Sequence, residues 1–231
     1  MEAGFENLEP SGALPSASPP LNEVELSYRD RLALRPWESE TALQRLDVPL
    51  KLFPGYCPVI TKWVVLTGAT CAGKTTLITE LDRRGYPVLH EVARAYVEDE
   101  VKKGREVPEI RADDVWFRQQ VFSLTLDTEI NLLSHAHELI FFDRSAVDSL
   151  SFHRGSGYNP HEILNQLQSY RYAQVFHCNP LPFVDDGLRT ANEERRLFLD
   201  AALARDYKAL GYRPVRIPYA SVEERVKRIF G

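Results

Sequence analysis

The segment GATCAGKTT, residues 68–76, carries small residues, one lysine and two threonines in the spacing G-x-x-x-x-G-K-[ST]. Glycines adopt backbone angles that other residues avoid, so successive amide groups can surround a phosphate group. In such a loop Lys74 would reach the β- and γ-phosphates of a nucleoside triphosphate, and the hydroxyl of Thr75 would bind Mg²⁺. The residues expected to hold the nucleotide are Gly68, Ala69, Thr70, Cys71, Ala72, Gly73, Lys74, Thr75 and Thr76.

The flanks of this segment favour a phosphate-binding loop over an accidental glycine-rich turn. The run WVVLT precedes it, and KTTLITELDRR continues as a helix whose positive end would point at the bound anion. Cys71 lies within the loop. The simpler interpretation is a small residue at an unconstrained position, and the alternative is redox control of nucleotide binding.

Charged residues follow two further apolar runs. Asp143 ends ELIFFD, where its carboxylate would hold Mg²⁺ through water; the alternative role is an N-cap of the next helix. Arg144 can bind a phosphate or carboxylate of a substrate, and Asp148 one turn later either assists it or forms an internal ion pair. Glu91 is the last residue of PVLHE and could accept the proton of an acceptor hydroxyl. The alternative is that its negative charge only interacts with the positive end of the helix that begins there. Arg94 could then meet an anionic part of the acceptor.

The segment 179–196 is polar and contains two prolines and several arginines. We expect a mobile flap that closes on the γ-phosphate and neutralises the charge of the transferred group, with Arg189 as the first candidate. Arg195 and Arg196 follow in the next helix. The alternative is an exposed loop with solvated charges.

A parallel sheet would bring these residues together at its carboxyl edge. From Lys62 onward, short apolar runs alternate with helical segments, which predicts an α/β fold with helices on both faces. The run LIFF is apolar on consecutive residues, so its strand should be central and lie beside the first. The expected strands are 63–67, 87–91, 138–143, 172–178 and 214–218. The expected helices are 74–84, 91–103, 111–135, 145–154, 160–170, 192–210 and 221–230.

The first part of the chain has a different composition. Residues 1–20 are rich in Pro and Ser and predict a disordered tail. Residues 21–58 contain several large apolar side chains and predict a partly ordered extension, either packed on the domain or serving as a linker. A protein partner could bind through this extension. Residues 59–231 are expected to form the nucleotide-binding domain.

The composition limits the other partners. A chain of 231 residues with Lys+Arg 28, Asp+Glu 33 and a net charge of -5 has no basic block, which argues against nucleic acid. No run reaches the roughly 18 apolar residues of a membrane span, and the start lacks a secretory signal, so we expect a cytoplasmic protein. The three cysteines are Cys57, Cys71 and Cys178, and their wide spacing predicts free thiols.

Several motifs together resemble the small single-domain P-loop proteins with an AAA-type domain. They are GATCAGKTT, HEVARAYVEDE, FFDRSAVDSLSF, DDGLR with EERR, and YKALGYRPVRIPYASVEERV. This group is similar to the nicotinamide riboside kinase domain and, more distantly, to thymidylate and deoxynucleoside kinases. The resemblance implies a P-loop NTPase three-layer sandwich with a five-stranded parallel sheet in the kinase-like order 2-3-1-4-5.

The resemblance also implies roles for the candidate residues. Lys74 and Thr75 would bind nucleotide and Mg²⁺, Asp143 and Arg144 would form an acidic–basic pair near metal and acceptor, and Arg189 would be the lid arginine. Glu91 matches the acidic position that follows the second strand. An AAA motor would need an extended acidic strand end and a second helical subdomain. Neither can be recognised in this sequence, which disfavours an oligomeric mechanical ATPase.

The function expected from these features is a Mg-ATP-dependent kinase that phosphorylates a small nucleoside-like or nucleotide-like acceptor. Its cofactors would be ATP and Mg²⁺, and Lys74, Glu91, Asp143, Arg144 and Arg189 would be the catalytic residues. The alternative is a nucleotide-dependent regulatory ATPase or interaction protein without a small-molecule acceptor. A signalling GTPase is disfavoured because no N-K-x-D motif is present.

Overall fold

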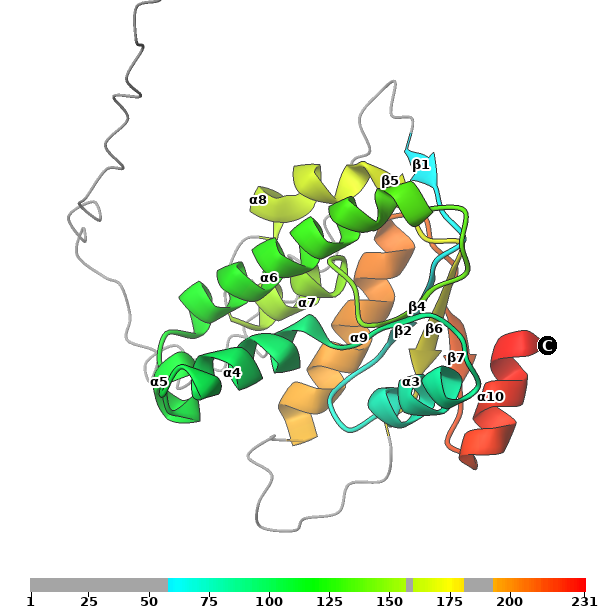
Figure 1. Ribbon diagram of the computed structural model, residues 1–231, viewed down its shortest axis with the longest axis horizontal. Coiled ribbons are helices and arrows are strands. Elements are labelled where there is room, and N and C mark those ends of the chain that lie inside the picture. The colour runs from blue at the N-terminus through cyan, green and yellow to red at the C-terminus, as the bar shows by residue number, and fades with distance from the viewer. Residues whose placement is uncertain (1–57, 157–159, 181–192) are drawn as a thin grey trace, which may run out of the picture.

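Short apolar runs pair into a five-stranded parallel sheet in the computed structural model (Figure 1). Its strands are β2 (Val64–Thr67), β3 (Val88–Leu89), β4 (Phe141–Asp143), β6 (Gln174–Cys178) and β7 (Val215–Ile217). The spatial order is β3-β4-β2-β6-β7, which is 2-3-1-4-5 in chain order and confirms the predicted sheet. As expected, β4 lies beside β2, with Val65 paired to Phe142.

The structure describes residues 58–156, 160–180 and 193–231. The predictions for the tail (1–20), for nearly all of the extension (21–58) and for Arg189 therefore lie outside the described residues. Within the described part, no helix combines the length and the apolar character that crossing a membrane requires.

Helices cover both faces of the sheet. The side chains of β2 alternate, so Val65 joins one apolar cluster with Phe142 while Leu66 joins another with Phe141. Helices α3 (Lys74–Arg83) and α10 (Val222–Phe230) pack on the Leu66 face. Helices α6 (Asp114–Asn131), α7 (Asp148–Gly155) and α9 (Glu193–Ala209) pack on the Val65 face. The result is the expected three-layer arrangement (Figure 1).

The remaining helices differ from the sequence prediction mainly at their ends. Helix α4 (Val92–Lys102) agrees with it, whereas the predicted helix 111–135 begins later, as α6, and ends as the 3₁₀ helix η1 (Leu132–His135). The short helix α5 (Val107–Ile110) lies before the predicted range. Asp113 sets the later start, because its side chain accepts the amides of Val115 and Trp116 and so caps α6. The predicted helix 160–170 becomes α8 (His161–Leu164) followed by the 3₁₀ helix η2 (Asn165–Gln168).

One short parallel pairing was not predicted. Strand β1 (Val59–Ile60) pairs with β5 (Tyr170–Arg171) at the edge of the molecule where the described chain begins. The two strands are only two residues long, which is below the length at which apolar alternation can be recognised in a sequence.

A buried carboxyl group ties α6 to the sheet. Glu129 is fully buried and accepts hydrogen bonds from the hydroxyl of Tyr170, from the hydroxyl of Tyr172 at 2.6 Å and from the amide of Ala146 at 2.8 Å. Burial raises the pKa of Glu129 to about 7, although all three donors act in the opposite direction. Because Ala146 follows Arg144 closely, this contact fixes the turn that leaves β4.

The shifted pKa of Glu129 predicts a pH-dependent stability. Between pH 4.5 and about 7 the folded state holds a proton on Glu129 that the unfolded state has lost, so stability falls as pH rises. The shift from 4.5 to about 7 corresponds to about 3 kcal/mol. Glu129→Gln removes this contribution, and urea unfolding at pH 5 and pH 7.5 should show a smaller pH effect in the variant.

The exposed carboxylate Asp127, two residues away on α6, gives the matched control. Asp127→Asn should keep the pH dependence of the wild type. An unchanged pH effect in Glu129→Gln would show that Glu129 does not retain its proton in the folded protein.

Candidate functional site

The turn between β2 and α3 has the backbone geometry of a phosphate-binding loop. Gly68 has φ +137°, and a Cβ at that position would lie 2.5 Å from the carbonyl oxygen of Cys178. Gly73 is the N-cap of α3 with φ 71°. Position 68 therefore requires glycine, and at position 73 glycine adopts the left-handed conformation without strain. Cys71 also has a positive φ, 60°, and is a free thiol that is partly exposed.

Lys74 lies folded back into this loop. Its ammonium donates to the carbonyl oxygens of Gly68 at 3.0 Å and Ala69 at 2.8 Å, and the residue is 5% exposed. Burial and, secondly, the charge of Arg144 lower the pKa of Lys74 to about 8. The ammonium thus lies in a desolvated position where an anion would stabilise its charge.

Thr75 and Asp143 form the polar pair expected beside a bound metal ion. The hydroxyl of Thr75 donates to Oδ2 of Asp143 at 2.8 Å. The other oxygen, Oδ1, is shielded from solvent and has no hydrogen-bond partner among the described residues, and burial raises the pKa of Asp143. The expected alternative role of Asp143 as a helix cap is not seen, since α7 begins at Asp148 without a side-chain cap.

This donor set fits Mg²⁺ in the manner of a phosphate-binding loop. Mg²⁺ prefers oxygen ligands and keeps several waters, so one hydroxyl and one carboxylate suffice when phosphate oxygens complete the shell. The described residues contain no group of three or more His, Cys, Asp or Glu side chains that could hold a metal ion by themselves. The unpartnered oxygen of Asp143 is available to a water of such an ion.

Arg144 connects the loop to two carboxylates. It has φ +70°, and its guanidinium donates to Glu91 at 2.9 Å, to Asp148 at 3.2 Å and to the carbonyl oxygen of Gly68 at 3.1 Å. Burial acts to raise the pKa of Glu91, but the charges of Arg144 and Lys74 outweigh it and lower that pKa. Glu91 is therefore an ionised carboxylate at neutral pH.

Asp148 is the second carboxylate that contacts the guanidinium of Arg144. It is 2% exposed and accepts the hydroxyls of Thr67 at 2.9 Å and Tyr207 at 2.7 Å. Tyr207 in turn contacts the hydroxyl of Ser145 at 2.7 Å. The internal ion pair, which the sequence left open for Asp148, is thus present and is held by neutral donors from β2 and α9.

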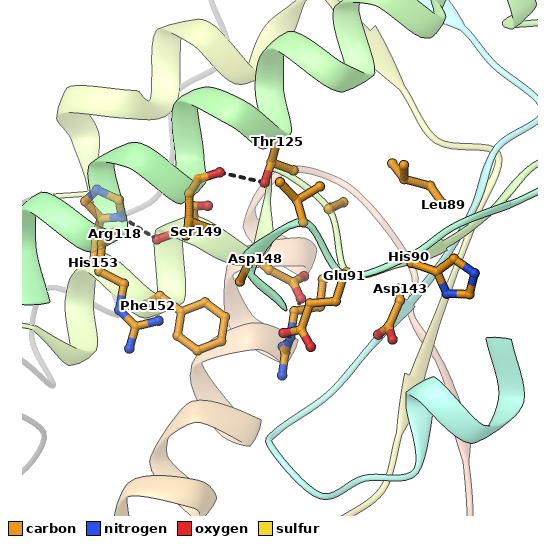
Figure 2. A pocket seen from close by; sticks show the side chains of 15 residues that line it. Leu89, His90, Glu91, Arg118, Thr125, Asp143, Asp148, Ser149, Phe152 and His153 are labelled. Carbon is orange, nitrogen blue, oxygen red and sulfur yellow. Dashed lines mark hydrogen bonds and ion pairs between the residues drawn. The ribbon is translucent and has the colours of Figure 1, made fainter. Parts of the chain in front are cut away.

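A cleft opens beside Glu91 and Asp143, on the α6 and α7 side (Figure 2). The empty space between its lining residues, open solvent included, is about 550 Å³. The side chains that line it include Leu89, Arg118, Thr125, Ser149, Phe152 and His153. Nδ1 of His153 donates to the carbonyl oxygen of Ser149 at 2.7 Å, which fixes the ring.

Sequence reasoning missed these cleft residues and one further contact. Arg118, Val121 and Thr125 share a face of α6, a helical spacing that resembles an ordinary packing face. Arg225 of α10 is buried and donates from Nη2 to the carbonyl oxygen of Ala72 at 2.8 Å, so the last helix fixes the loop. Arg225 and Ala72 are 153 positions apart in the sequence, so no local motif predicts their contact.

Two arginines proposed from the sequence lie elsewhere. Arg94 is exposed and does not line the cleft. Arg196, at the start of α9, is buried and donates to Glu193 at 2.6 Å.

Comparisons with known proteins agree with this geometry. A family model described as an AAA domain matches residues 63–225. The structure of NadR protein in complex with NR is 23% identical, with TM-score 0.53 over 73% of this chain and 49% of that one. NadR in complex with NAD and AMP-PNP is 19% identical, with TM-score 0.54 over 86% of this chain and 54% of that one. The chain thus spans about half the length of these NadR chains.

A kinase structure shares the fold over its whole length. Thymidylate kinase from Ehrlichia chaffeensis is 14% identical, with TM-score 0.51 over 75% of this chain and 98% of that one. No curated protein matches the chain. The similarity to P-loop proteins with an AAA-type domain and to these kinase-like structures, predicted from the motifs, is confirmed.

The lowered pKa of Lys74 predicts that nucleotide binding depends on pH. Above pH 8 the free protein loses the proton of Lys74, whereas bound phosphates would retain it, so affinity for Mg-AMP-PNP should fall as pH rises through about 8. Calorimetry at pH 8 in two buffers of different ionisation enthalpy should show proton uptake on binding. Lys74→Arg keeps its charge and should bind without that uptake. Equal heats in both buffers for the wild type would contradict this assignment.

Proposed function

Because the chain belongs to the family of this AAA domain, we propose that it is a Mg-ATP-dependent kinase that phosphorylates a small nucleoside-like or nucleotide-like acceptor. One observation carries the proposal. Glu91 and Asp143, at the ends of neighbouring strands, line the same cleft, and Asp143 also contacts Thr75 of the loop. A γ-phosphate held by the loop would therefore face an acceptor in the cleft.

The proposal assigns the nucleotide to residues 68–76. Lys74 would exchange its two carbonyl contacts for oxygens of the β- and γ-phosphates, and the amides before α3 would surround the β-phosphate. Thr75 and, through water, Asp143 would hold Mg²⁺, whose charge neutralises the phosphate oxygens. Arg189, outside the described residues, remains the proposed lid arginine.

Glu91 is proposed to orient the acceptor. Its lowered pKa makes it a weak base but an ionised hydrogen-bond acceptor at neutral pH. That suffices for a loose transition state, in which the attacking hydroxyl needs alignment more than early deprotonation. The contact with Arg144 at 2.9 Å would hold the carboxylate in place for this role.

The similar structures support a nucleoside-like or nucleotide-like acceptor. One NadR structure contains NR, and the Ehrlichia chaffeensis protein is named a thymidylate kinase. The alternative is a regulatory ATPase without a small acceptor. One observation favours this alternative: Glu91 and Asp148 already neutralise Arg144 inside the protein. The three charged groups could therefore stabilise the fold without taking part in a reaction.

Glu91→Gln separates the two functions. Losing an aligned carboxylate should lower acceptor-dependent ADP release by about 100-fold or more, while the affinity for Mg-AMP-PNP should change little. The measurement is a coupled ADP assay with a panel of nucleosides and nucleotides, beside calorimetric titration with AMP-PNP. Glu98→Gln, which changes an exposed carboxylate of α4, is the matched control.

Two results would contradict the proposal. The first is that no acceptor stimulates ADP release by the wild type above its rate with water, which removes the kinase function. The second is that an acceptor stimulates release and Glu91→Gln retains the full stimulated rate, which removes the role of Glu91 from the proposal.

A further inference from the structure

A second arginine, Arg118, lines the cleft, and the chemistry proposed above does not use it. It comes from α6, on the same face as Val121 and Thr125, which also line the cleft. Figure 2 shows Arg118 next to Phe152, at the end of the cleft away from Asp143. A residue in this position can contact only the part of an acceptor that is remote from the loop.

Contacts with an aromatic ring place Arg118 relative to the reacting end. Arg144 contacts Glu91 at 2.9 Å, and its Cζ lies 5.0 Å from the ring centroid of Phe152. The Cζ of Arg118 lies 4.8 Å from the same centroid. Arg118 therefore contacts the same phenyl ring as Arg144, the residue that holds Glu91. Phe152 stabilises both cations by cation–π contact.

The charge of Arg118 is less well compensated than that of Arg144. Among residues 58–156, 160–180 and 193–231, Arg118 contacts one carboxylate, Asp114, at 3.3 Å, and Asp114 also accepts the hydroxyl of Ser156. The atom that makes this ion pair is Nε, which is shielded from solvent and forms no hydrogen bond with the described residues. Arg144, by contrast, contacts two carboxylates.

Other cations surround the same end of the cleft. Burial lowers the pKa of Arg118, and the charges of Arg195, Arg111 and Arg144 act in the same direction against Asp114. Arg111 and Arg118 both lie over the ring of Phe117, at 5.4 and 5.6 Å. A partly buried guanidinium among like charges is a position that an anionic ligand group would stabilise.

We propose that Arg118 binds a negatively charged group, a carboxylate or a phosphate, on the acceptor at the end remote from the hydroxyl that faces Glu91. The inference rests on the proposed kinase function and narrows its acceptor class to anionic riboside-like compounds. Arg118 is then the residue that distinguishes such acceptors from neutral nucleosides, because its planar fork matches carboxylate and phosphate oxygens.

Matched acceptors test this assignment. The first arm uses pyridine and pyrimidine ribosides, each with a ring carboxylate or the equal-sized carboxamide, and the second uses nucleoside 3′-phosphates against the parent nucleosides. The readouts are kcat/KM for ADP release and, independently of turnover, Kd in the presence of Mg-AMP-PNP. In at least one arm the wild type should prefer the anionic member by about 10- to 100-fold.

The variants are Arg118→Gln, Arg118→Lys and the control Arg111→Gln. Arg118→Gln should reduce the preference to near one, and Arg118→Lys should retain part of it because the charge remains. Arg111→Gln removes a nearby exposed charge that does not line the cleft and should keep the preference. Thermal unfolding of each variant checks that the fold is intact.

The outcomes separate this inference from the proposed function. Turnover with neutral acceptors and no anion preference in either arm overturns the role of Arg118 and leaves the kinase function. Tight binding of anionic probes that depends on Arg118, without any turnover, supports the anion site and refutes the kinase. A preference that Arg118→Gln retains, or a wild type that binds no anionic probe, overturns the inference.

Discussion

The site depends on how the buried guanidinium of Arg144 is neutralised. It lies at the end of β4 in a left-handed backbone conformation and contacts Glu91, Asp148 and the carbonyl oxygen of Gly68, which belong to three different segments. A buried cation is costly unless paired, and removal of one partner leaves an uncompensated charge. The fold therefore fixes the phosphate-binding loop and the cleft carboxylate relative to each other. The hydrogen bonds of Thr67 and Tyr207 to Asp148 extend this constraint to β2 and α9.

The two sides of Arg144 have complementary electrostatics. On the loop side, Lys74 has a lowered pKa and Asp143 a raised one, so burial disfavours the charged form of both groups in the free protein. In a bound magnesium triphosphate, the phosphates would stabilise the charged form of Lys74 and the metal ion would stabilise the charged form of Asp143. On the cleft side, Glu91 is ionised and held in place. This division suits a reaction that depends on alignment and charge neutralisation rather than on covalent chemistry by the protein.

The strands and the phosphate-binding loop could be predicted because residues adjacent in the sequence indicate each of these elements. The motif around Lys74 required a strand before it and a helix after it, and the consecutive apolar residues of Phe141 and Phe142 required a central strand. The cleft wall could not be predicted in this way. Arg118 and Phe152 meet only because α6 and α7 pack on the same face of the sheet, and Arg225 reaches Ala72 from the last helix. Helix ends were displaced where a side chain such as Asp113 competed for backbone amides.

A crystal structure of the protein with Mg-AMP-PNP tests the central claim most directly. The account predicts that the ammonium of Lys74 leaves the carbonyl oxygens of Gly68 and Ala69 for phosphate oxygens, and that the metal lies beside Thr75 and Asp143. The Arg144–Glu91 contact would persist, with Glu91 facing the γ-phosphate across the cleft. A nucleotide bound away from residues 68–76, or a Glu91 carboxylate turned out of the cleft in the complex, would contradict it.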